Sequence, residues 1–322
     1  LLVVVLVSCS GSDYLNAIPK KSTALISVDL QQMASDKNAE DKAGMLKSLL
    51  HVDDVDKCGI DISEKLYLFE SADGNLGLCA KVSDEGDVED WLASLAKKRI
   101  ASEVKERKGF HFAVLKDSWL VGFSGQALLV MGPVVADAQA QLQQQMVKYL
   151  KAEEEDGITV SPMYERLQTL SSPMAMVAQA QALPEKFVAP FTLGAPKDTD
   201  PSQVVTAADM KVKHGILQLQ GETFSFNETI DKALQKAAQN YRPIKGSYVK
   251  SMPDDALAGI FMNVEGTRFL PLVQSNQGLQ TLLMGITAAI DMDNIIRSVD
   301  GDMAIVMPSL GTDNMQMTME AR

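Results

Sequence analysis

Histidine, cysteine and tryptophan are scarce in this chain, which narrows the chemistry that its side chains can support. Among 322 residues there are three His, three Cys and two Trp. The histidines lie far apart, without the close spacing of a metal-binding motif, at His51, His111 and His214. The Gly-rich fingerprints of phosphate and dinucleotide sites are also missing. The sequence therefore predicts no catalytic residue, no metal site and no cofactor.

Basic side chains are fewer than acidic ones. The chain has 30 Lys and Arg against 42 Asp and Glu, which gives a net charge of −12 at pH 7. Binding to phosphate backbones needs a local excess of Lys and Arg, so we do not expect nucleic acid as a partner. The same deficit argues against electrostatic attachment to anionic lipid. The hydrophobic fraction of 46% is that of an ordinary folded protein, and the length suits about two domains.

A long hydrophobic run is missing as well, since a transmembrane helix needs about 20 apolar residues. The chain instead begins with seven apolar residues, which are followed by Ser8 and Cys9. Leu6-Val7-Ser8-Cys9 fits the lipobox of bacterial lipoproteins, in which an aliphatic, a variable and a small residue precede the cysteine. Residues 1–8 are then the remnant of a signal peptide, and Cys9 is the predicted lipidation site. The alternative is a buried N-terminal strand that happens to end in cysteine.

The residues after Cys9 favour an anchored protein. Ser10 to Asp13 are small and polar, as in a flexible linker, and residues 9–17 form the predicted lipidated tether. Acyl chains contribute about 0.8 kcal/mol per buried CH₂, so several chains give lasting attachment. We therefore expect an extracytoplasmic protein that is anchored through lipid to the bacterial cell envelope, at the outer membrane.

Two further cysteines, Cys58 and Cys79, permit two interpretations. In an oxidising compartment they are able to form a disulfide. Alternatively they are separate buried thiols, because cysteine packs as a small hydrophobic residue. The sequence leaves both interpretations open.

Hydrophobic periodicity predicts an α+β fold in which antiparallel sheets pack against helices. The clearest signals are the hairpin turn at Asp73-Gly74-Asn75 and the helix starts at Ser161-Pro162 and Asn227. The predicted strands are 23–30, 66–69, 76–82, 110–115, 118–123, 127–131, 174–182, 204–213 and 216–226. The predicted helices are 31–50, 87–107, 133–150, 162–170 and 228–241.

The order of strand, helix and hairpin occurs twice. Residues 18–30 align with 252–264, and the hairpin 66–82 aligns with 305–321. We therefore predict a first α+β domain or repeat at 18–245 and the start of a second, truncated repeat at 246–322.

Methionines alternate along the last predicted hairpin, so they point to one face. They are expected to form a plastic core layer, and the alternative is a contact surface for a partner. The residues are Met303, Met307, Met315, Met317 and Met319.

Two segments resemble a known family. Residues 14–30 place Ile18-Pro19 before an alternating strand that ends in Val28-Asp29-Leu30. They resemble the start of a domain-of-unknown-function family of Bacteroides-type predicted lipoproteins, as do residues 57–61 ahead of the hairpin. The resemblance implies an α+β extracytoplasmic protein with no established activity, and it supplies no catalytic residues.

These observations leave three candidate functions. The leading one is a lipid-anchored envelope protein that binds or scaffolds, with the membrane as a partner through the anchor and a protein as a second candidate partner. An envelope hydrolase would need paired carboxylates about 5–10 Å apart in a cleft. A solute-binding lipoprotein would need a ligand cleft between domains.

Overall fold

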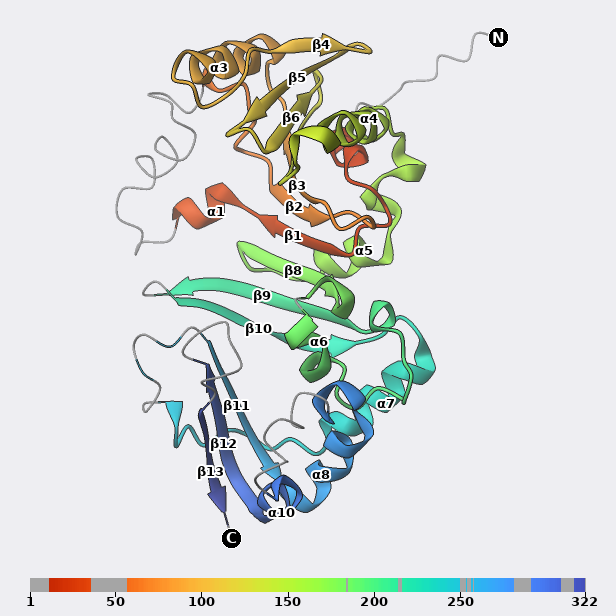
Figure 1. The fold of residues 1–322 in the computed structure, drawn as a ribbon, viewed down its shortest axis with the longest axis vertical. Coiled ribbons are helices and arrows are strands. Elements are labelled where there is room, and N and C mark those ends of the chain that lie inside the picture. The colour runs from red at the N-terminus through yellow and green to blue at the C-terminus, as the bar shows by residue number, and fades with distance from the viewer. Residues whose placement is uncertain are drawn as a thin grey trace. The chain divides into compact units, whose positions relative to one another are not determined.

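The computed structural model describes residues 12–35, 57–183, 185–213, 216–249, 253, 256, 258–280, 291–307 and 316–321 (Figure 1). The predicted signal remnant 1–8, the lipidation site Cys9, and both His51 and His214 lie outside the described residues.

The chain forms two compact units. Unit 1 comprises Leu1–Ala178 and Thr206–Glu222, and unit 2 comprises Gln179–Val205 and Thr223–Arg322. This division differs from the boundary at residue 245 that the sequence predicted. The difference arises because the hairpin of residues 206–222 belongs to unit 1, while the residues on both sides of it belong to unit 2.

The fold is α+β, as predicted. The described strands form a ten-stranded sheet and a three-stranded sheet, and each pairing with a defined register is antiparallel. Helices pack against both sheets.

The ten-stranded sheet lies almost entirely in unit 1. Its strands are β1 (Ala24–Val28), β2 (Leu66–Glu70), β3 (Leu76–Lys81), β4 (Lys105–Arg107), β5 (Phe110–Leu115), β6 (Trp119–Phe123), β7 (Ala127–Gly132), β8 (Met174–Gln179), β9 (Val205–Lys213) and β10 (Ile216–Phe224). Their order across the sheet is β10-β9-β8-β1-β2-β3-β7-β6-β5-β4. The first strand is therefore internal, and it pairs with β8 from much later in the chain.

Four α-helices and four short 3₁₀ helices are described in unit 1. The α-helices are α1 (Leu30–Ser35), α3 (Glu85–Lys97), α4 (Gln139–Leu150) and α5 (Pro162–Gln168). The 3₁₀ helices are η1 (Asp13–Ala17), η3 (Ala136–Ala138), η4 (Glu154–Asp156) and η5 (Ile158–Val160).

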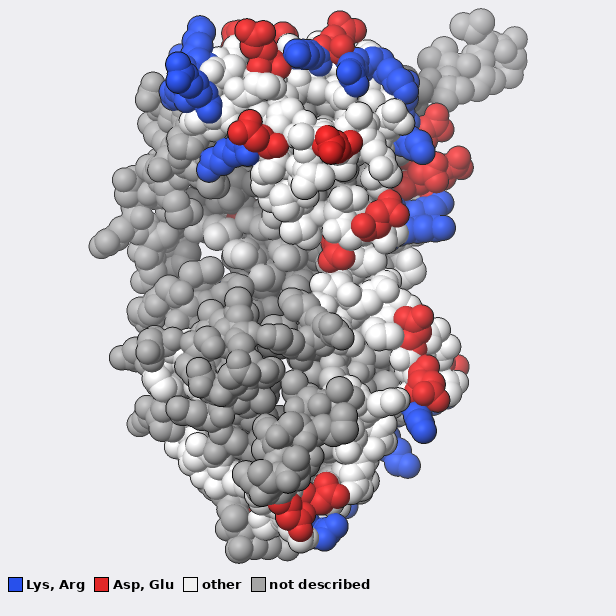
Figure 2. All heavy atoms as spheres, in the orientation of Figure 1, with Lys and Arg blue, Asp and Glu red and all other residues white. Residues whose placement is uncertain are grey.

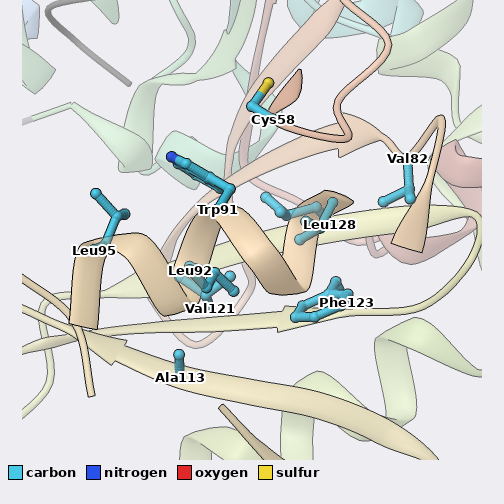
Figure 3. Packing of buried hydrophobic residues seen from close by; sticks show 10 residues of the cluster. Cys58, Val82, Trp91, Leu92, Leu95, Ala113, Val121, Phe123 and Leu128 are labelled. Carbon is cyan, nitrogen blue, oxygen red and sulfur yellow. The ribbon is translucent and has the colours of Figure 1, made fainter. Parts of the chain in front are cut away.

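Helix α3 covers one face of the ten-stranded sheet. Asp84 begins the helix, since its carboxylate accepts the Asp87 N–H at 2.9 Å. The buried stripe of the helix packs on apolar side chains of β5, β6 and β7 in one core cluster. Figure 3 shows Leu92 of α3 against Val121 of β6, with Cys58 at the other side of the helix.

The opposite face of the same sheet is covered by η1, α4 and α5. Phe69 of β2 and Met131 of β7 point to it and are buried. Gly77 lies between them in the register, and a Cβ there would come within 2.2 Å of the Phe69 ring. The neighbouring row on this face begins with Ser27, Tyr67 and Cys79, one from each of β1, β2 and β3.

Helix α3 ends at Lys97, well before the predicted end at residue 107. Arg99 has a left-handed φ of 59°, which stops the helix, and Ala101 forms a bridge with Leu115. Val104 still packs on the α3 cluster, but it lies beyond the end of the helix. The helical spacing of apolar residues in the sequence therefore extends past the residue at which the helix ends.

Two other predicted helices also differ from those described. The helix predicted at 31–50 is described as α1 over Leu30–Ser35, and the remainder of the prediction lies outside the described residues. Helix α4 begins at Gln139 and not at Pro133, because η3 precedes it.

Unit 2 contains the three-stranded sheet and its helices. The strands are β11 (Ala258–Glu265), β12 (Val299–Met307) and β13 (Gln316–Ala321), in that order across the sheet. The helices are α6 (Glu185–Phe191), α7 (Glu228–Ala238), α8 (Gly266–Ser275) and α10 (Met292–Ser298), with short 3₁₀ helices η6 (Ala180–Ala182) and η7 (Pro201–Gln203). Helices α8 and α10 pack on one another and supply most of the core of this sheet.

The methionines whose side chains are described belong to that core. Met262, Met303 and Met319 are register partners across β11, β12 and β13, so they share a face. Met303 is 4% exposed, and the other two pack against the same cluster. For Met303 and Met319 the core interpretation is confirmed; the side chains of Met307, Met315 and Met317 lie outside the described residues.

Strands β11-β12-β13 have the same order and pairing as β1-β2-β3. Ile26 pairs with Leu68, and Ile260, its counterpart in the sequence alignment, pairs with Ile305. By strand register Leu68 corresponds to Ile305, whereas the alignment of the two repeats in the sequence paired Leu66 with Ile305. A slip of two residues keeps every side chain on its own face, which is why the hydrophobic pattern did not reveal it.

Within the described part of the chain, no helix has the length and apolarity that crossing a bilayer requires. On the face drawn in Figure 2, the described Lys and Arg side chains are interspersed with Asp and Glu.

Candidate functional site

A pocket in unit 1 opens beside η1, on the sheet face that η1 and α5 cover. Its volume is about 430 Å³, within the range of small-molecule sites. Three tyrosines line it, Tyr14, Tyr67 and Tyr164, and we call it the tyrosine pocket. The other lining residues are Leu15 and a polar set: Ser12, Asp29, Ser63, Glu64, Lys65 and Gln168.

The three tyrosines come from distant parts of the sequence and form one aromatic cluster. Tyr67 lies between the other two, with its ring centroid 6.3 Å from each. The rings are tilted, by 54° toward Tyr14 and by 42° toward Tyr164. The chain has six tyrosines, so half of them meet at this pocket.

Local sequence explains how each tyrosine is placed. Tyr67 belongs to the row of β2 residues that points toward η1 and α5. Ser161 caps α5 by accepting the Tyr164 N–H at 3.1 Å, and Pro162 fits the first helical position. Tyr164 is thereby fixed in the first turn of α5, and Gln168, four residues later, lies on the same side of the helix.

The phenol hydroxyls lie close to other polar groups. Tyr14 Oη donates to the Lys65 carbonyl at 2.9 Å. The side chains of Tyr164 and Gln168 lie close enough to the Tyr67 hydroxyl to influence its pKa. Burial raises the pKa of all three phenols above the ordinary value of 10.0, and neighbouring ionisable groups add to the effect for Tyr14 and Tyr67. The pocket therefore presents neutral hydroxyls at physiological pH.

Charged groups stand at the edge of the pocket. Asp29 follows β1, and its carboxylate accepts the Gln32 N–H at 2.7 Å at the start of α1. Glu64 forms an ion pair with Lys81 at 3.3 Å, and Lys81 also pairs with Asp61 at 3.2 Å. Hydrogen bonds from Ser63 and Lys81 hold the pKa of Asp61 below its usual range, while Asp61 and Glu64 raise the pKa of Lys81. These ion pairs fix the loop that carries Ser63, Glu64 and Lys65.

Cys58 and Cys79 are both buried thiols, so the structure shows the second of the two interpretations that the sequence left open. Cys58 packs in the α3 cluster. Cys79 lies on the other face, opposite Tyr67 in the register, and its thiol donates to the Tyr14 carbonyl at 3.4 Å. Burial raises the pKa of this thiol well above its ordinary value.

The remaining histidine, His111, lies away from the pocket. Its Nδ1 is 3.2 Å from the Glu85 carboxylate, and its ring packs on Phe123. Among the described residues, no group of three or more His, Cys, Asp or Glu side chains is arranged to hold a metal ion.

The pocket was not predicted from the sequence. Its residues Tyr14, Tyr67 and Tyr164 are separated by many elements, and no short motif links them. What the sequence did identify are two of the segments that build it, since residues 14–30 and 57–61 with the following hairpin carry the family resemblance. The pocket gathers residues from the first of these segments and from the start of the hairpin region.

Comparisons with known proteins place the chain in a family without assigning an activity. No curated protein matches it. Crystal form IV of TP0453 is similar in structure with a TM-score of 0.39 and 12% identity, over 65% of this chain and 79% of that one. Crystal form III of TP0453 gives 0.34 and 12%, over 66% and 93%. Residues 30–320 match the family described as Domain of unknown function (DUF4836). The chain therefore belongs to this family, as the resemblance of its N-terminal strand and hairpin predicted.

Proposed function

We propose that this chain is a lipid-anchored protein of the bacterial cell envelope that binds a small polar ligand in the tyrosine pocket. The observation that carries the proposal is the gathering of three tyrosines, two carboxylates, an ammonium group and an amide around one cavity. Burying polar groups costs free energy unless they find partners. A ligand that forms hydrogen bonds with these groups would therefore stabilise the folded protein.

The position of the pocket in the chain supports the anchored arrangement. Ser12 lines the pocket, and Cys9 of the lipobox is three residues earlier. Consecutive Cα atoms are 3.8 Å apart, so the Cα atoms of these two residues lie within about 11 Å of each other in any conformation. An acyl group on Cys9 would hold the pocket near the membrane surface.

The anchor is tested by lipid labelling. Full-length protein with its native leader is expressed in bacteria that are fed a clickable fatty acid, and Cys9→Ala is compared with the wild type. We expect label in the membrane fraction of the wild type and none in the variant. Intact mass spectrometry of the wild type gives a second test. A mass that corresponds to unmodified Cys9 with residues 1–8 still attached would overturn the anchor.

The binding role is tested separately by thermal unfolding with fractionated small molecules from cell envelopes, because a ligand of the folded state raises Tm. Tyr164→Phe removes one pocket hydroxyl. Tyr149→Phe is the matched control, since Tyr149 is a half-buried tyrosine on α4 outside the pocket lining. We expect a fraction that raises Tm of the wild type and of the control more than that of Tyr164→Phe. Equal shifts in all three proteins, or no shift with any fraction, would exclude the pocket as the binding site.

An envelope hydrolase remains the second candidate, because Asp29 and Glu64 line the same pocket. Two carboxylates at one cavity are what acid–base hydrolysis of a glycosidic bond requires. The candidates separate once a ligand is in hand. A hydrolase converts it to product and loses turnover but retains binding in Glu64→Gln, whereas a binding protein releases it unchanged.

A further inference from the structure

We infer that the ligand of the tyrosine pocket is a saccharide. This inference rests on the proposed binding function and adds the chemical class of what is bound. Its basis is the kind of hydrogen-bonding groups in the pocket, their charge balance and the one partly exposed aromatic ring among them.

The pocket walls disfavour apolar and anionic ligands. Leu15 is the one aliphatic side chain of the lining, and it is only 2% exposed. An apolar ligand would displace water from the surrounding polar groups and form no hydrogen bonds with them in return. The carboxylates at the pocket and its edge, Asp29, Glu64 and Asp61, outnumber the cations Lys65 and Lys81, so a phosphate or a nucleotide would meet net negative charge.

The same walls match a ligand that is rich in neutral hydroxyl groups. Each sugar hydroxyl donates one hydrogen bond and accepts others, so it suits a wall that offers both kinds of partner. Carboxylates such as Asp29 accept at up to about four positions, and the Gln32 N–H occupies one of these. The amide of Gln168 and the ammonium of Lys65 are donors, and the Tyr164 hydroxyl both donates and accepts.

Tyr164 also supplies a surface on which a sugar ring packs. Tyr14 and Tyr67 are 4% and 3% exposed, so their rings belong to the core and mainly hold the pocket in shape. The ring of Tyr164 is half-buried, on a short capped helix, and it is tilted against Tyr67. An aromatic side chain with an apolar face and a polar tip is suited to the C–H groups and hydroxyls of one pyranose.

The sugar has two sources that share this chemistry. It is either a free saccharide or the headgroup of a glycolipid beside the anchor. The arms of the experiment distinguish them. Free cellobiose, maltose and N,N′-diacetylchitobiose are tested by saturation-transfer NMR and calorimetry with the full chain. Vesicles of phosphatidylethanolamine with and without monoglucosyl diacylglycerol are tested by co-sedimentation with the full-length Cys9→Ala protein, so that acylation does not contribute.

The variants tie binding to the pocket. Tyr164→Phe removes one neutral hydrogen bond, which weakens binding about threefold to tenfold. Asp29→Asn removes a charged acceptor and is expected to weaken it by about tenfold or more. Asparagine keeps an oxygen for the Gln32 N–H, so α1 retains its start. Tyr149→Phe binds as the wild type does, and circular dichroism confirms that every variant is folded.

The inference is supported if binding of a saccharide or of the glucosyl lipid is weakened most in Asp29→Asn, less in Tyr164→Phe and not at all in Tyr149→Phe. A signal that is unchanged in Tyr164→Phe and Asp29→Asn overturns it, as does the absence of binding to all four sugar probes. A parallel arm uses the dipeptide D-alanyl-D-alanine. Pocket-dependent binding of this dipeptide without any sugar binding overturns the saccharide inference and leaves the proposed binding function standing.

Discussion

Asn263 and Asp302 face each other across β11 and β12, and the Asn263 amide donates to the Asp302 carboxylate at 2.7 Å. Both side chains are buried. Asp302 also accepts the backbone N–H groups of Lys245 at 3.0 Å and Ser247 at 2.9 Å. Burial alone would raise the pKa of Asp302, but these hydrogen bonds outweigh it and lower the pKa from 3.8 to about 2. One carboxylate thus fastens the segment 245–247 to the sheet of unit 2.

We predict that Asp302→Asn destabilises unit 2 in a pH-dependent manner. The folded pKa of Asp302 is below its ordinary value, so the charged carboxylate stabilises the fold at pH above about 4. This contribution is lost as the pH falls from there through 2. Urea unfolding of the wild type and Asp302→Asn, at a series of pH values, is expected to show a gap that is constant near neutral pH and closes in acid.

The control for this prediction is Asp293→Asn, in an exposed position on α10 of the same unit. Its difference from the wild type is expected to be small at every pH. A gap for Asp302→Asn that does not change between pH 6 and pH 2 would contradict the role given to the carboxylate charge.

The start of α7 gives a second prediction. Asn227 accepts the N–H groups of Thr229 at 3.0 Å and Ile230 at 3.3 Å. Asn227→Ala removes these bonds and should lower the free energy of unfolding by about 1 kcal/mol. Asn227→Asp keeps an accepting oxygen and adds a favourable charge at the helix N-terminus, so it should match or exceed the wild type. Denaturant titration measures both, and equal losses in the two variants would show that the cap is not the cause.

The turn between β4 and β5 gives a third prediction, this time of a gain. Lys108 and Gly109 form a two-residue loop with φ of 52° and 80°, which is the geometry that Asn-Gly prefers. Lys108→Asn should therefore raise the free energy of unfolding by up to about 1 kcal/mol. Gly109→Ala should lower it by a similar amount, through backbone strain alone, because no atom lies within 4 Å of the added Cβ. Two shifts of the same sign would refute the turn assignment.

Much of the α+β framework could be predicted because its signals are local. The Asp73-Gly74 turn, the Ser161-Pro162 start and the Asn227 cap each act within a few residues, and the described hairpin and helices begin where these signals lie. The end of α3 could not be predicted in this way. Val104 keeps the spacing of a helix although it lies beyond the end of α3, so periodicity alone does not show where the helix ends.

Long-range partners explain the other differences. Asn263 is a polar residue within β11, which continues to Glu265, and Asp302 on the next strand accepts a hydrogen bond from its amide. The tyrosine pocket depends in the same way on contacts between η1, β2 and α5. A single tyrosine in each element carries no signal by itself, and only the fold brings the three rings together.

The Tyr67 ring, which we expect to separate the pocket from the Cys79 sulfur, gives the last prediction. Cys79 is the register partner of Tyr67 and is 0% exposed. Because the thiolate is the reactive form, and burial raises the pKa of this thiol, we expect iodoacetamide to modify Cys79 very slowly in the native protein. Tyr67→Ala removes the ring and opens the pocket toward the sulfur, so peptide mapping by mass spectrometry should show much faster alkylation of Cys79.

Loss of a large core side chain also destabilises the fold by about 3–5 kcal/mol, which by itself increases exposure of Cys79 through unfolding. Leu92→Ala controls for this, since Leu92 is equally buried but lies in the α3 cluster on the opposite face. If both variants accelerate alkylation alike, iodoacetamide reaches the thiol through unfolding, and the Tyr67 ring does not protect it. If only Tyr67→Ala does so, the Tyr67 ring separates the pocket from Cys79.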